Sequence, residues 1–80
     1  MFIYDDHGLT TVNTSKIRVL YIDRIESATA HTAEEHDKQD VFKLKAYVGG
    51  RFTVILAEVT GKHNIPVLTA KMHQITDGKH

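Results

Sequence analysis

The chain has no cysteine and no tryptophan, and it has a single proline among its 80 residues. Without cysteine it cannot form a disulfide, a thiolate zinc site, a thiol nucleophile or a redox switch. A chain of this length makes one domain and buries only about 60% of its unfolded surface. We therefore expect a single domain of modest stability over residues 1–80, for which self-association is a common way to bury more surface.

An excess of charge of either sign is also missing, because ten Lys and Arg balance ten Asp and Glu. Nucleic-acid-binding proteins usually carry a basic excess, so binding of that kind would need a local basic patch. The chain has no apolar run of about 18 residues, as a membrane-spanning helix needs, and its N-terminus lacks the features of a signal peptide. These absences predict a cytoplasmic protein with no membrane partner.

The strongest local signal lies in residues 41–59, VFKLKAYVGGRFTVILAEV, where a Gly-Gly pair separates two apolar runs. Such a pair favours a β-hairpin. A two-residue loop would place the apolar residues of the return strand beside the lysines, whereas a three-residue loop aligns three apolar pairs. We therefore predict the loop Val48-Gly49-Gly50 and the pairs Phe42–Leu56, Leu44–Val54 and Ala46–Phe52.

The other face of this hairpin would then carry Lys43, Lys45, Tyr47 and Arg51. Basic side chains around an aromatic ring are one way in which a sheet binds single-stranded nucleic acid. Lysines on an exposed strand also protect a sheet against pairing with another sheet, and we favour this second interpretation. These four residues are the candidate face for a partner or a nucleic acid.

Three further strands are predicted before the hairpin. Residues 1–4 and 9–13 flank an Asp- and Gly-containing turn, DDHG, and predict a first hairpin. Residues 17–25, IRVLYIDRI, are apolar in both alternation phases, as in a central strand or in one that a partner covers. Leu20 and Ile22 lie in the second phase, so we regard them as a possible second apolar face.

The remaining segments predict a loop and a helix. Residues 26–40 are polar without an apolar stripe, which predicts a long exposed loop or, alternatively, a helical turn around residues 30–36. Asn64 is a good N-cap for a helix over the following residues, and residues 77–80 are expected to be a flexible tail. The apolar stripe of this helix consists of Ile65, Leu68, Met72 and Ile75.

The order of these elements predicts an α+β fold. We expect a small antiparallel β-sheet of about four or five strands with one C-terminal helix packed on one face. The helix would cover the apolar side of the hairpin, namely Phe42, Leu44, Val54 and Leu56.

Residues capable of catalysis or metal binding are present, but not in a recognised arrangement. His31 and His36 are five residues apart, so they do not share one face of a helix, and a structural zinc site needs four ligands. Ser15 and Ser27 lack the surroundings of a nucleophile elbow. We therefore predict no catalytic residue, no metal, no cofactor and no enzymatic activity.

The opening strand, the DDHG turn and the segment VNTSKIRVLYI resemble small bacterial and phage domains of unknown function. Those domains continue with a hairpin and a C-terminal helix, so the resemblance spans most of the chain. The polar residues 26–40 and the proline in the helix depart from their pattern. The resemblance implies an accessory protein from a prophage or other mobile element and transfers no functional residue; anti-CRISPR-like inhibitors are comparable in size and class only.

These features predict a small non-enzymatic interaction module that docks onto a protein partner or self-associates, for example as a homodimer. The alternative is weak binding of single-stranded nucleic acid through the basic face of the 41–59 hairpin.

Overall fold

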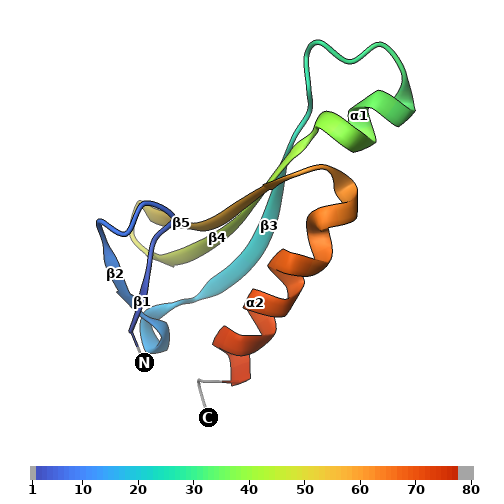
Figure 1. The fold of residues 1–80 in the computed structure, drawn as a ribbon. Helices are drawn as coiled ribbons and strands as arrows, with labels where there is room; N and C mark the ends of the chain where they lie inside the picture. Colours follow the sequence, from blue (N-terminus) through green and yellow to red (C-terminus); the bar gives the residue numbers. More distant parts are fainter. Residues whose placement is uncertain (1, 78–80) are drawn as a thin grey trace.

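The computed structural model describes residues 2–77, which form five strands, two α-helices and two short 3-10 helices (Figure 1). In chain order these are β1 (Phe2–Tyr4), β2 (Thr11–Asn13), η1 (Thr14–Lys16), β3 (Val19–Ile25), α1 (Ala33–Gln39), β4 (Val41–Gly49), β5 (Phe52–Thr60), η2 (Lys62–Asn64) and α2 (Ile65–Asp77). The predicted α+β class is confirmed, with α2 as the C-terminal helix. Asp77 belongs to α2, and the rest of the predicted tail lies outside the described residues.

The strands form two antiparallel sheets where the sequence suggested one. β1 pairs with β2 in a two-stranded sheet, and the second sheet has the order β3-β4-β5. The first hairpin is therefore confirmed, and Gly8 in its turn has a φ of 70°. The prediction that residues 17–25 form a central strand is wrong, because β4 is central and β3 lies at an edge.

The turn between β4 and β5 differs from the predicted three-residue loop. Gly49 pairs with Phe52, so only Gly50 and Arg51 lie between the strands. The register shifts twice, and each shift adds one residue to one strand: Val48 on β4 and Leu56 on β5. The three predicted pairs are therefore wrong: Phe42 lies opposite Val59, Leu44 opposite Ala57 and Ala46 opposite Val54. Bulges, rather than a longer loop, therefore let both strands turn their apolar residues to the same side.

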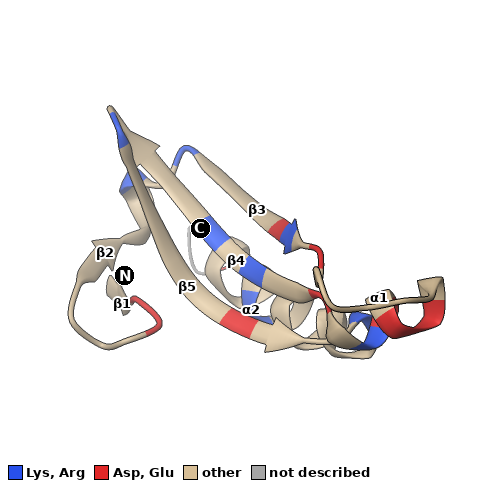
Figure 2. Ribbon diagram, turned by 90° about the horizontal axis from the view of Figure 1, so that it is seen from above, with Lys and Arg blue, Asp and Glu red and all other residues tan. Residues whose placement is uncertain are grey.

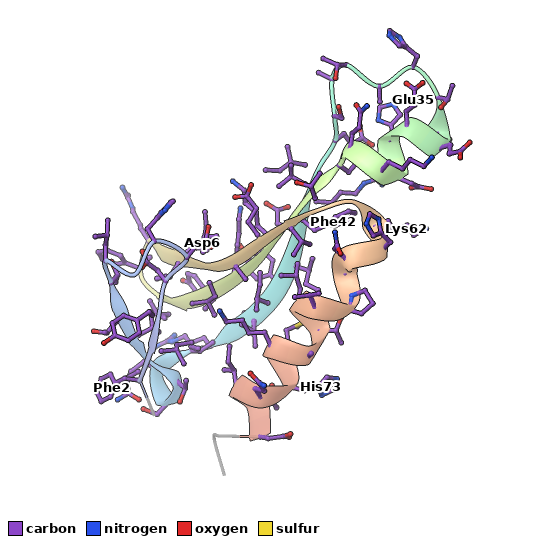
Figure 3. The ribbon with its side chains drawn as sticks, viewed as in Figure 1. Phe2, Asp6, Glu35, Phe42, Lys62 and His73 are labelled. Atoms are coloured by element: carbon purple, nitrogen blue, oxygen red, sulfur yellow. The ribbon has the colours of Figure 1, made fainter. Side chains whose placement is uncertain are left out.

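The core lies between this sheet and α2. Leu44, Leu56 and Leu68 are almost completely buried, and Phe42 lies between the sheet and the start of α2 (Figure 3). The predicted helical stripe is confirmed, since Leu68 and Ile75 are buried and Ile65 and Met72 pack beside them. The side chain of the predicted N-cap Asn64 donates to the Thr60 carbonyl at 2.7 Å.

Of the two alternatives for residues 26–40, the helical one is correct: the segment contains α1, which covers Ala33–Gln39 rather than residues 30–36, so the segment is not a long loop throughout. Thr32 is its N-cap and accepts a hydrogen bond from the Glu35 amide at 3.1 Å, while the Glu35 carboxylate accepts from the His31 amide at 2.7 Å. The two bonds hold the first turn in a variant of the capping box, in which the carboxylate accepts from the residue before the N-cap. None of the helical residues is buried, which explains why no apolar stripe marked the helix.

Candidate interaction surface

One face of the three-stranded sheet is open in the described part of the chain. α2 packs on the inner face, and Figure 2 looks onto the opposite side, which we call the outer face. Strand alternation and the pairing register place four rows of side chains there. From β3 across β4 to β5 they are Val19–Tyr47–Thr53, Tyr21–Lys45–Ile55, Asp23–Lys43–Glu58 and Ile25–Val41–Thr60.

The structure brings together three of the four residues predicted for a basic face. Lys43, Lys45 and Tyr47 lie on the outer face along β4. Arg51 is exposed in the turn beyond the end of the rows. The Tyr47 hydroxyl donates to the Gly50 carbonyl at 2.9 Å, so the ring is tied to the same turn.

The charges on the outer face compensate one another. Lys45 Nζ lies 2.6 Å from an Asp23 carboxylate oxygen, and this hydrogen bond lowers the pKa of Asp23 and raises that of Lys45. Lys43 sits in the row between Asp23 and Glu58. Two basic and two acidic side chains therefore leave this face without net charge.

The assignment of Leu20 and Ile22 to a second apolar face is corrected by the register. Both side chains point to the inner face, where they pack partly buried against the core. The exposed apolar side chains of β3 are those on its outer side, where Val19, Tyr21 and Ile25 are 50%, 37% and 43% exposed. The exposed apolar surface of the outer face is therefore concentrated on the edge strand β3.

The two edges of the sheet differ. Along β5, the first hairpin lies beside the sheet, and the backbone amide of Asp6 donates to the Ile55 carbonyl at 2.8 Å (Figure 3). Along β3, Figure 2 shows no further strand or helix beside the ribbon. Within residues 2–77, the hydrogen bonds of the β3 backbone to a neighbouring strand are those to β4. The β3 edge is therefore free to pair with another strand.

The C-terminal end of β3 is held by a buried carboxylate, which the sequence did not single out. Asp40 is completely buried and accepts hydrogen bonds from Arg24 Nε at 2.7 Å and from the Ser27 amide at 2.8 Å. The Ser27 amide and then the Arg24 side chain hold the pKa of Asp40 below its ordinary value. Its backbone also accepts from the Gly61 amide at 2.8 Å, so one residue links β3, α1 and the start of η2.

The histidines considered as metal ligands lie at α1. His36 Nδ1 is 3.7 Å from an Asp40 carboxylate oxygen, while His31 precedes the helix and is exposed. In the part of the chain that the structure describes, no group of three or more His, Asp and Glu side chains is arranged to hold a metal ion.

Two grooves lie beside the first hairpin. One of about 300 Å³ is lined by Asp5, His7, Thr10 and residues 52–55. Asp5 faces it, but its carboxylate already accepts from the Leu9 amide at 2.7 Å and the Thr10 amide at 3.1 Å. The latter bond is the main cause of the lowered pKa of Asp5, and this carboxylate serves the turn.

Among the described residues, no helix has both the length and the apolar character needed to cross a membrane. No protein-family model, curated protein or solved structure matches the chain.

Proposed function

We propose that this protein is a non-enzymatic interaction module that binds another polypeptide along β3. The observation that carries the proposal is the free edge of β3, whose outer side chains Val19, Tyr21 and Ile25 are substantially exposed. An added strand would pair its backbone with this edge and place alternate side chains against those three residues.

The edge lacks the usual protection against such pairing. β3 contains no proline, glycine or lysine, and its seven residues pair with β4 without a bulge. Proteins normally block an edge strand by a bulge, a charge that projects from it, or a covering segment. The two charges of β3 are already paired inside the protomer, Asp23 with Lys45 and Arg24 with Asp40. An incoming strand would therefore not leave either charge unpaired.

Binding of single-stranded nucleic acid, the alternative, has weaker support. Tyr47 and the two lysines do share the outer face, as that function would require. However, Lys45 is engaged by Asp23, and Glu58 stands opposite Lys43. A phosphate backbone would meet a face without net charge, whereas nucleic-acid affinity depends on uncompensated cations.

A test of the proposal compares extended peptides with oligonucleotides as ligands. Peptides selected from a random library on the wild-type protein should lose at least about tenfold in affinity for Val19→Lys. They should bind Val67→Lys unchanged, because Val67 is equally apolar and 59% exposed but lies on α2. The proposal is overturned by saturable oligonucleotide binding that falls steeply with salt and that Lys43→Ala with Lys45→Ala abolishes.

A further inference from the structure

The sequence of β3 is complementary to itself, and we propose that a second copy of this chain pairs with it. The inference rests on the proposed function, since it names the polypeptide that occupies the free edge. The two β3 strands would run antiparallel about a two-fold axis at Ile22 and join two three-stranded sheets into one of six strands. In such a dimer both α2 helices lie on the same side, because a two-fold axis relating adjacent antiparallel strands is perpendicular to the sheet.

With the axis at Ile22, all seven residues of β3 find a partner. Val19 faces the partner's Ile25 on the outer face, which covers two of the three exposed apolar side chains of each protomer. Tyr21 faces the partner's Asp23, where its hydroxyl can donate to a carboxylate that Lys45 already binds. On the inner face Ile22 meets its own copy. The remaining pair on that face is Leu20 with the partner's Arg24. Contacts between side chains directly opposite one another are the unit of stabilisation in a sheet.

The neighbouring registers oppose like charges. An axis at Asp23 would place this carboxylate against its own copy, and an axis at Tyr21 would place Arg18 against the partner's Arg24. Both arrangements are unfavourable, because like charges directly opposite across a strand pair destabilise it. Each of these two registers also places two residues at one end of β3 opposite residues outside the partner's β3. The charges in β3 and directly before it therefore select the register centred on Ile22.

The same register joins two charges that flank the strand. Arg18 immediately precedes β3 and Glu26 immediately follows it, so each would face the other residue of the partner. Among residues 2–77 the Arg18 side chain has no carboxylate within ion-pair distance, and the Glu26 side chain, 71% exposed, has only a 3.8 Å contact with Arg24. In Figure 2 this separation of charge is visible as a basic segment (blue) at the start of β3 and an acidic segment (red) just beyond its end. The dimer would contain this pair twice.

Within the protomer, the described elements leave room for the second copy. α2 packs against β4 and β5, and the first hairpin lies along β5, at the other edge of the sheet. α1 lies beyond the end of β3 rather than beside it (Figures 1 and 2).

The test is sedimentation of the 80-residue chain from micromolar to millimolar concentration. We expect twice the mass of one chain at the upper end. Arg18→Glu or Glu26→Lys alone should weaken dimerisation by about tenfold or more, because each creates two repulsive contacts. The double variant Arg18→Glu, Glu26→Lys should return to within about threefold of wild type, since the pairs re-form with exchanged signs.

The matched control is Asp6→Lys, which also reverses an exposed acid but lies in the turn at the covered β5 edge. It should change the dimerisation constant by less than about twofold. Circular dichroism confirms that each variant is folded. A wild-type monomer throughout, or a double variant no better than the single ones, would overturn the dimer. If the peptides selected above still bind β3 in that case, the proposed function stands and only the identity of the partner is wrong.

Discussion

At the scale of single residues, Gly61 occupies a position that other residues cannot easily take. Its φ is 92°, its amide binds the Asp40 carbonyl, and a Cβ added there would lie 3.2 Å from the Lys38 carbonyl oxygen and 2.6 Å from the His63 ring. Gly8 also has a positive φ, 70°, but a Cβ there would meet nothing within 4 Å. The two glycines therefore separate backbone strain from crowding.

Gly61→Ala should lower the free energy of unfolding by about 2–3 kcal/mol, and Gly8→Ala by only about 1 kcal/mol. Both substitutions strain the backbone, but only the first pushes a methyl group against the link between η2 and the end of α1. Urea denaturation of the two variants measures the difference. Equal losses would mean that crowding at Gly61 has no effect.

The carboxylate of Asp40 makes stability depend on pH. Its folded-state pKa is lowered, so protonation favours the unfolded chain. Its contribution is therefore present above the unfolded pKa of about 3.9 and is lost as the pH falls through the lower folded value. Asp40→Asn should lower the melting temperature at pH 7 by about 5–10 °C and flatten its decline below pH 4. A melting temperature of Asp40→Asn that declines below pH 4 as steeply as that of the wild type would contradict this role of the Asp40 carboxylate.

At the scale of elements, α2 is held by one stripe of side chains. Leu68 is completely buried, whereas Val67 beside it is 59% exposed. Leu68→Ala should cost about 2–5 kcal/mol of unfolding free energy because it leaves a cavity under the helix. Val67→Ala should change it by no more than about 0.5 kcal/mol. Thermal denaturation of the pair measures this, and comparable losses would show that α2 does not rest on the sheet through Leu68.

The elements differ in how far the sequence could predict them. α2 was predictable because Leu68 and Ile75 repeat at helical spacing on the side that is buried. The helix in residues 26–40 was only an alternative to a loop because α1 buries nothing, although Thr32 followed by Glu35 is a capping-box signal that could have indicated its start. The register of β4 and β5 was not predictable, since two bulges that leave no mark in the apolar pattern replaced the expected loop.

At the scale of the whole molecule, the sequence showed that residues 17–25 are apolar in both alternation phases but could not tell which side of β3 is covered. Alternation gave the two phases correctly, yet the choice between them depends on the pairing of β3 with β4, a contact between distant parts of the chain. The basic face was predicted from Lys43, Lys45 and Tyr47, which do lie together. Its compensation by Asp23 depends on the same pairing and was therefore missed.

The central claim, pairing of β3 with a second copy about Ile22, can be tested by cysteine cross-linking, because the chain has no native cysteine. In this register Tyr21 is opposite the partner's Asp23, with Cβ atoms about 5 Å apart, while identical residues lie on a diagonal of about 7–8 Å. A disulfide needs Cβ atoms about 4 Å apart, so it should form between opposite positions and not along the diagonal.

The measurement mixes Tyr21→Cys with Asp23→Cys under mild oxidation and determines which disulfides form by mass spectrometry. The account predicts that the mixed 21–23 dimer predominates and that neither variant alone cross-links efficiently. Preferential 21–21 or 23–23 dimers, or no disulfide in the mixture, would contradict it.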